Sequence, residues 1–422
     1  MRSARTALKA LYLVIVTASL LFLLLKIRHV VGAQRAYVSL PDYGDLHRFD
    51  PDREGGHLLP NMNLLVRTAK ASESVRWVTN SKGFRSEKEF SYTHPARTFR
   101  ILFLGDSYSD GMRTDQKRTI GYLLEEELNA RAAAGDFDRF EVMISGHNNP
   151  TNAWYYFQRH GYKYTPDLVL LGVTLGNDLT WNSYRSTFVP VRDAQGRPAL
   201  EWTHKPDQDD HKGVDLMIPY DAYLQDESAD GPLPRERRIR AYLAAKSILF
   251  GYEIPPIVNP LPSRPRHFFA TDFSVSLGLF YMPTMPGIEA IYADFEETLA
   301  GFADTAARNG SRLAVVLFPV RMQLHGKDWA LLRRFYRLRD EKFDLEYPDR
   351  RLLAFCRSHD ILCADALPAL RAAAREHPWS HLYCPRGDMH FNENGQEVVA
   401  GGLSEFVRSL LEAQGPSGAA RH

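Results

Sequence analysis

The stretch Arg100-Ile-Leu-Phe-Leu-Gly-Asp-Ser-Tyr-Ser-Asp-Gly111 decides the fold of this 422-residue chain. Its apolar run, Ile101 to Leu104, is stopped by Gly105. Such a run is typical of a central parallel strand whose two faces are covered by helices. Ligands of these sheets bind at the carboxyl ends of the strands, where the hydroxyl of Ser107 is expected. The segment alone leaves two interpretations open: a nucleophile presented on the turn, or a serine that caps a tight strand-to-helix turn.

Two further strands are predicted to end at the same edge of the sheet. Apolar residues recur at helical spacing over 119–134, which predicts a crossover helix. Buried strands are predicted over 140–146 and 167–175. The first ends in Gly146, and the second runs into Gly176-Asn177-Asp178. Because the carboxyl ends of parallel strands meet at one edge, these small and polar residues are expected to lie near Ser107.

Residues 180–285 interrupt this pattern with a segment rich in proline, charge and aromatic residues. It is too long for an ordinary connection, so we predict an inserted cap or substrate-binding lobe with one helix over 235–250. Strands and helices then alternate again, with helices predicted over 287–309, 350–358 and 395–413 and strands over 313–318 and 361–365. The sequence therefore predicts one α/β domain over 99–414, interrupted by the lobe.

Composition excludes some classes of protein. A net charge of +1 and the lack of a polybasic run give no electrostatic basis for binding nucleic acid. The three cysteines, Cys356, Cys363 and Cys384, have neither the spacing of a zinc site nor the density of a disulfide scaffold. Either one disulfide in an exported domain or three thiols fits this pattern, and the histidines and aspartates of 204–211 fit no standard metal site.

The amino terminus predicts a membrane anchor. Residues 7–25 are almost wholly apolar and just long enough to span a bilayer. A cleaved signal peptide fits less well, because the small residues at 31–33 lie well beyond the charged block at 26–29. The positive charges before the apolar run slightly outweigh those after it, which places the amino terminus in the cytoplasm and the body outside it. We therefore predict an anchor and its flank over 1–33 and an extracytoplasmic location, periplasmic in a Gram-negative bacterium.

Two other segments flank the predicted domain. Residues 34–98 are turn-rich and are predicted to form a β-rich lead-in, in which Asn80-Ser81-Lys82-Gly83-Phe84-Arg85 reads as a short glycine turn. That turn belongs either to a hairpin docked on the edge of the sheet or to the rim of the pocket. Residues 415–422 are predicted to be a disordered tail.

A possible base lies just before the last predicted helix, in Gly387-Asp388-Met389-His390-Phe391-Asn392. An aspartate near a histidine can bond one imidazole nitrogen, fix the tautomer and leave the other nitrogen for a serine hydroxyl. Acyl transfer through a serine also needs hydrogen-bond donors for the oxyanion. The main-chain N–H groups of Ser107 and Gly146 and the side-chain amide of Asn177 are the predicted donors.

These four blocks, in this order, resemble the SGNH (GDSL-type) hydrolase superfamily. Gly105-Asp106-Ser107 resembles the first block, Gly146 the second, Gly176-Asn177-Asp178 the third, and Asp388-x-His390 the last. The resemblance covers roughly 100–179 and 361–411. It implies a flavodoxin-like three-layer α/β/α sandwich, no cofactor, and esterase chemistry. One residue separates Asp388 from His390, where many members have two.

By position, the resemblance makes Ser107 the nucleophile, His390 the base, Asp388 its orienter, and Gly146 and Asn177 part of the oxyanion hole. The expected function is hydrolysis of acyl esters, of a small molecule or of O-acetyl groups on cell-envelope glycans. Two alternatives remain: an O-acyltransferase that uses the same triad, and a catalytically idle carbohydrate-binding protein. The segment 80–85 is similar to one that precedes the first block in membrane-anchored bacterial relatives, and no role follows from that similarity.

Overall fold

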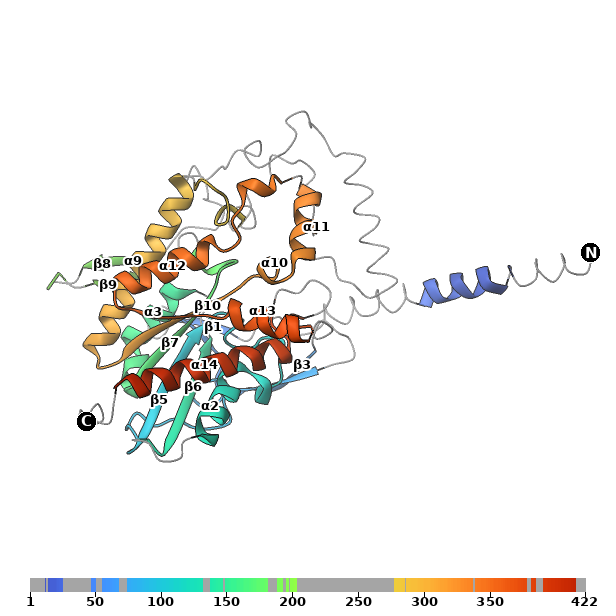
Figure 1. Ribbon diagram of the computed structural model, residues 1–422. Helices are drawn as coiled ribbons and strands as arrows, with labels where there is room; N and C mark the ends of the chain where they lie inside the picture. The colour runs from blue at the N-terminus through green and yellow to red at the C-terminus, as the bar shows by residue number, and fades with distance from the viewer. Residues whose placement is uncertain are drawn as a thin grey trace, which may run out of the picture.

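Figure 1 shows the computed structural model of the chain. The structure describes residues 12, 14–25, 47–50, 55–67, 74–131, 137–146, 149–180, 188–192, 195–196, 198–202, 277–284, 286–336, 338–377, 381–384 and 390–414. Several predictions lie outside these residues, namely the helix over 235–250, most of the inserted lobe, the tail at 415–422, and Asp388.

The centre of the fold is a five-stranded parallel sheet. Its strands are β5 (Thr98–Gly105), β6 (Arg139–Gly146), β7 (Leu168–Thr174), β10 (Arg312–Phe318) and β11 (Leu362–Asp365). They lie side by side in the order β11-β10-β7-β5-β6. Counted along the chain, this order is 2-1-3-4-5, one of the common doubly wound arrangements. The winding direction reverses between β5 and β7, so a ligand crevice is expected at the carboxyl ends of these two strands.

Helices cover both faces of the sheet (Figure 1). One face packs against α2 (Ile120–Ala130), α13 (Leu367–Glu376) and α14 (Glu393–Gln414). The other packs against α3 (Pro150–Arg159), α9 (Pro286–Arg308) and α12 (Tyr347–Ser358). Two further helices, α10 (Arg321–Leu324) and α11 (Gly326–Tyr336), follow β10 in the chain and precede α12. The α/β fold predicted from the sequence is confirmed.

Close packing on the second face depends on one glycine. A Cβ at Gly301 in α9 would lie 2.3 Å from the ring of Trp154 in α3. The indole Nε1 of Trp154 donates a 3.0 Å hydrogen bond to Thr305 Oγ1, one turn further along α9. Together these contacts fix α3 against α9, because the buried indole donor has its partner there.

Smaller antiparallel sheets flank the central one. In the segment 34–98, β1 (His47–Asp50) pairs with β2 (Gly55–Leu58), and β3 (Asn63–Arg67) pairs with β4 (Ser74–Val78). Trp77 of β4 is fully buried in a small core with Leu58, Met62 and Val75. Within 180–285, β8 (Phe188–Arg192) pairs with β9 (Pro198–Trp202).

The amino-terminal apolar segment is helical where it is described, over 14–25. Its large side chains are exposed, with Val14 64%, Leu20 55% and Leu24 62% accessible. Over the described part of the chain, no helix reaches both the length and the hydrophobicity that crossing a membrane requires. The predicted span over 7–25 includes residues outside that part, so the anchor remains a prediction.

Cys356 and Cys363 form a disulfide that joins α12 to β11, with their Cα atoms 6.2 Å apart. Cys384 is buried and lies outside this bridge. Of the two cysteine states that the sequence left open, the structure contains the one with a single disulfide.

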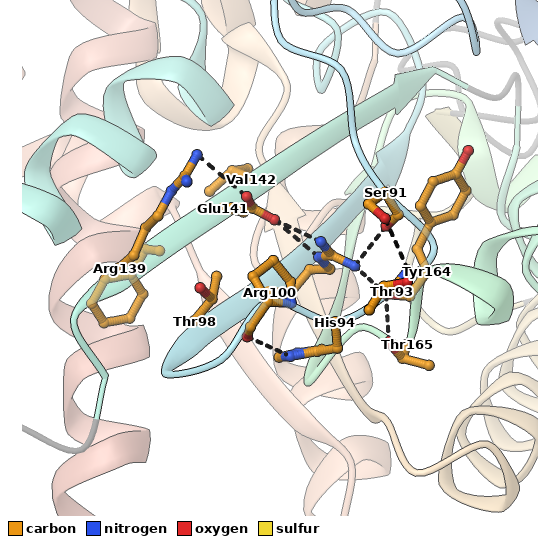
Figure 2. A network of polar contacts seen from close by, with 12 residues as sticks. Ser91, Thr93, His94, Thr98, Arg100, Arg139, Glu141, Val142, Tyr164 and Thr165 are labelled. Atoms are coloured by element: carbon orange, nitrogen blue, oxygen red, sulfur yellow. Dashed lines mark hydrogen bonds and ion pairs between the residues drawn. The ribbon is translucent and has the colours of Figure 1, made fainter. Parts of the chain in front are cut away.

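A buried ion pair lies at the amino ends of β5 and β6 (Figure 2). Arg100 is fully buried, and its Nη2 lies 2.8 Å from Glu141 Oε2 on the neighbouring strand. The Nη1 of Arg100 donates to the main-chain carbonyls of Ser91 (3.0 Å) and Tyr164 (2.8 Å). The guanidinium therefore joins two strands and two loops at the edge of the sheet opposite the predicted site.

The buried carboxyl group of Asp349 makes the stability of the fold depend on pH. Its carboxyl group is buried between α12 and α10, where Gln323 Nε2 donates to Asp349 Oδ2 at 2.6 Å. Burial, and then the nearby charge of Asp365, raises the pKa of Asp349 to about 7. The folded state favours the protonated form of Asp349. The stabilisation that this carboxyl group gives is therefore fully present below its pKa in the unfolded chain and is lost as the pH rises through about 7.

We therefore expect Asp349→Asn to flatten the pH dependence of stability. The wild-type chain should lose a few kcal/mol of unfolding free energy between pH 5 and pH 8 from this group, and the variant should lose less. Urea unfolding at several pH values measures the difference, with the exposed Asp294→Asn on α9 as the control. Parallel pH curves for the wild type and Asp349→Asn would contradict this assignment.

Candidate active site

Ser107 and His390 meet at the carboxyl edge of the sheet. Ser107 lies in the turn that follows β5, and His390 lies three residues before the start of α14. Ser107 Oγ is 2.7 Å from His390 Nε2, although 283 positions separate the two residues in the sequence. Both are half-buried. This distance is within hydrogen-bonding range for a nucleophile and its general base.

Glycines let the turn that carries Ser107 fold back onto the sheet. A Cβ on Gly105 would lie 2.0 Å from Ser109 Oγ, and a Cβ on Gly172 in β7 would lie 2.2 Å from the same atom. Ser109 is therefore fully buried between two strands, while Ser107 stays accessible. The N–H of Met112 donates to the carbonyl of Ser107 at 3.0 Å and closes the turn. The same short segment thus presents one serine and buries another.

Gly146 ends β6 directly beside this turn. It is the register partner of Gly105, the residue that ends β5. A Cβ at Gly146 would lie 2.1 Å from Asp110 Oδ2, so only glycine lets the carboxylate approach this closely. Gly146 is consequently held against the turn that carries Ser107.

Asn177 lies in the turn after β7, the other neighbour of β5. Its N–H donates to the carbonyl of Thr174 at 3.3 Å, and its own carbonyl accepts from Thr180 Oγ1 at 2.9 Å. Asp178 closes the turn, since its Oδ2 accepts from the N–H of Thr174 at 2.7 Å. Asn177 is half-buried at the same edge as Ser107.

Two buried carboxyl groups lie behind the nucleophile. Burial raises the pKa of Asp106, and burial followed by the charge of Asp106 raises the pKa of Asp178 well above its usual range. Asp106 Oδ1 accepts from the N–H of Tyr108 at 2.9 Å. The other oxygen of Asp178, Oδ1, has no donor among the described residues. Burial thus disfavours the charged form of both carboxyl groups.

The loop that carries His390 is anchored on both sides. The N–H of Cys384 donates to the carbonyl of His390 at 2.8 Å, and Tyr383 and Phe391 form an antiparallel bridge. Phe391 is fully buried, and its ring packs edge-on against Tyr108, the residue after the proposed nucleophile. These contacts fix the main chain at His390, and its ring lies 5.0 Å from that of Tyr108 between centroids.

The structure brings together four of the five predicted site residues at one edge of the sheet. Ser107 and His390 are in direct contact, and Gly146 and Asn177 end or follow the strands on either side of β5. The fifth, Asp388, lies outside the described residues. The sequence left two interpretations of the turn at 80–85 open, a hairpin docked on the edge of the sheet or a segment that brings Arg85 or Asn80 near the pocket. The structure buries Arg85 completely against the turn that follows Ser107.

Comparisons with known proteins give only distant likenesses. No family model matches the chain, and no curated protein matches it. One similar solved structure is a two-domain esterase (CEX) active on acetylated mannans, with 9% sequence identity and a TM-score of 0.33 over 75% of this chain. The chain spans half the length of that protein. Another is LAE5, an alpha/beta hydrolase enzyme from the metagenome of Lake Arreo, Spain, with 12% identity and a TM-score of 0.36 over 76% of this chain and 98% of that one.

Proposed function

We propose that this protein is a serine esterase of the SGNH type that hydrolyses acyl esters. The observation that carries the proposal is the 2.7 Å contact between Ser107 Oγ and His390 Nε2 at the carboxyl edge of a doubly wound sheet. Such an edge is where ligands of these folds bind. Asp388 is proposed to orient His390, and Gly146 and Asn177 are proposed to complete the oxyanion hole.

In the proposed reaction, His390 Nε2 takes the proton of Ser107 as Oγ forms a bond to the ester carbonyl carbon. The main-chain N–H groups of Ser107 and Gly146 and the amide of Asn177 stabilise the negative oxygen. His390 then gives the proton to the leaving alcohol as the ester bond breaks, leaving an acyl group on Ser107. Water attacks this acyl-enzyme with His390 again as the base, and the acid is released as the proton returns to Ser107.

Asn177 offers a direct test of the oxyanion hole. Loss of one oxyanion donor typically lowers kcat by about 10²–10³-fold, so we expect Asn177→Ala to do so with little change in KM. Asn129→Ala is the matched control, because the Asn129 amide bonds the main chain of Phe140 at the far end of β6. Steady-state hydrolysis of p-nitrophenyl acetate checks both variants. Equal kcat values for the two would remove Asn177 from the mechanism.

We further propose that the chain is anchored in the membrane by residues 1–33, with its catalytic domain outside the cytoplasm. The exposed apolar side chains over 14–25 support an anchor, because large apolar patches on soluble monomers are uncommon. The Cys356–Cys363 disulfide supports an oxidising compartment. From this location we propose acylated cell-envelope glycans as the substrate class, with O-acetyl groups as the acyl group.

The same acyl-enzyme could pass its acyl group to a sugar hydroxyl in place of water, which is the O-acyltransferase alternative. A screen of short-chain and long-chain acyl esters and acetylated sugars, with and without an oligosaccharide acceptor, tests the proposed function. Release of free acid from short-chain or acetyl esters by the wild type is the expected result. Acyl transfer without release of acid would favour the transferase, and binding of sugars without either reaction would favour an idle carbohydrate-binding protein.

A further inference from the structure

We propose that Arg85 is a positioning residue for the proposed esterase reaction, on which this inference rests. Its role is to set the spacing between the two main-chain N–H groups assigned to the oxyanion hole, at Ser107 and Gly146. Arg85 comes from the lead-in segment, more than twenty residues before Ser107 in the sequence. The contacts of its side chain and main chain reach both of the strand ends that carry these donors.

The turn that delivers Arg85 is built by Asn80. Asn80 Oδ1 accepts hydrogen bonds from the N–H groups of Lys82 (2.9 Å) and Phe84 (3.1 Å), and its Nδ2 donates to the carbonyl of Lys88 (2.8 Å). Gly83 has a φ of 81°, a conformation that glycine adopts without strain. Phe84 then enters the main core. The contacts of Asn80, Gly83 and Phe84 thereby fix the position of the main chain at Arg85.

The guanidinium of Arg85 binds the main chain of the loop that follows Ser107. Nη1 donates to the carbonyls of Asp110 and Gly111, the latter at 2.8 Å, and Nη2 donates to the carbonyl of Thr114 at 2.7 Å. The planar group lies over the ring of Trp77, 3.8 Å from its centroid. The guanidinium is fixed by its stacking on Trp77, and its N–H donors therefore hold three carbonyls of one loop in a single orientation.

The main chain of Arg85 binds the other strand end. Its N–H donates to the carbonyl of Ile144 at 2.9 Å, two residues before Gly146. One residue thus ties the end of β6 to the turn after β5. The carboxylate of Asp110 fills the space between them, against the Cα of Gly146. Oxyanion stabilisation depends on donor positions, so a shift of this turn would lower transition-state binding more than substrate binding.

Arg100 supplies a matched control within the same sheet. Like Arg85 it is fully buried and donates to main-chain carbonyls, those of Ser91 and Tyr164. It lies five residues before Gly105, at the amino end of β5, about 16 Å from the catalytic edge at the rise of a strand. Loss of Arg100 is therefore expected to weaken the fold without moving the oxyanion donors.

The experiment compares Arg85→Lys and Arg85→Met with Arg100→Lys and Arg100→Met in the full-length chain. For each variant, kcat and KM are measured with p-nitrophenyl acetate, and the thermal midpoint is measured as well. A parallel sample is labelled to completion with a fluorophosphonate, and kcat is expressed per mole of Ser107 that takes up the label. We expect both Arg85 variants to lose about 10²-fold in kcat with KM changed by less than about threefold. The Arg100 variants should lower the thermal midpoint and keep kcat per labelled serine.

Two results would overturn the inference. One is a kcat within about threefold of the wild type for both Arg85 variants; the other is an equal loss of kcat in the Arg85 and Arg100 pairs, which would indicate a structural role alone. Failure of Ser107 to label in the wild-type chain would overturn the proposed function and this inference with it. A labelled wild type with unaffected Arg85 variants overturns this inference alone.

Discussion

Ser107→Ala is expected to lower kcat for ester hydrolysis by roughly 10⁴–10⁶-fold, the range typical for removal of a catalytic serine. The physical reason is that the hydroxyl placed 2.7 Å from His390 Nε2, which is proposed to form the acyl-enzyme, is removed. KM for the residual activity should change little, because the binding surface and oxyanion donors remain. Hydrolysis of p-nitrophenyl acetate by the purified full-length variant measures the effect.

Ser109→Ala is the control for this substitution. Ser109 lies in the same turn but is fully buried, with its Oγ lodged between Gly105 and Gly172. Removing its hydroxyl should leave kcat within about tenfold of the wild type, since Ser109 Oγ is packed between these two glycines. If Ser109→Ala lost the larger share of activity, the assignment of the nucleophile would be wrong.

Glu141→Ala is expected to lower the free energy of unfolding by about 3–5 kcal/mol. This substitution leaves the guanidinium of Arg100 buried at the amino edge of the sheet without its carboxylate, 2.8 Å away in the wild type (Figure 2). A buried charge without its partner costs far more than the lost attraction alone. Urea unfolding at neutral pH measures the change.

The double variant Arg100→Met with Glu141→Leu completes this test. Replacing a buried ion pair by apolar side chains of similar volume is often neutral or stabilising, so the double variant should recover most of the loss. The exposed pair of Arg97 and Asp138 is the control, because solvent screens it and Asp138→Asn should change stability little. A double variant less stable than Glu141→Ala would contradict this account of the network.

The sequence predicts the central strands well, for a physical reason. Strands buried on both faces are mostly apolar, and β5 and β7 are buried at every position, with Arg100 of β5 paired to Glu141. Such runs have few other interpretations in a chain of this composition. The predicted strands at 140–146, 313–318 and 361–365 likewise lie within one residue of β6, β10 and β11.

Two of the helices that cover the sheet were not predicted. No helix was expected over α3 or α13, although both are part of the two layers that cover the sheet. In α3 the polar Thr151 and Asn152 are buried together with the aromatic residues Trp154 to Phe157, so polarity does not separate its buried from its exposed positions. The α13 helix is short and rich in alanine, and its packing on α14 decides its place.

The candidate site is predictable in part. The order of short polar blocks along the sequence predicts that Ser107, Gly146, Asn177 and His390 lie at the carboxyl edge of the sheet. The sequence left the position of Arg85 open, because the partners of its guanidinium are main-chain carbonyls of residues 110–114, and carbonyls carry no sequence signal. The same holds for Ser109, whose burial depends on two glycines from different strands.

The central claim is that Ser107 is a nucleophile activated by His390. The most direct test is to treat the folded full-length protein with a fluorophosphonate and to locate the adduct by peptide mass spectrometry. We expect one phosphonyl group per chain, on Ser107, and no adduct in His390→Ala on the same timescale. Folded wild-type protein that takes up no label, or that is labelled at another residue while Ser107 stays unmodified, would contradict the account.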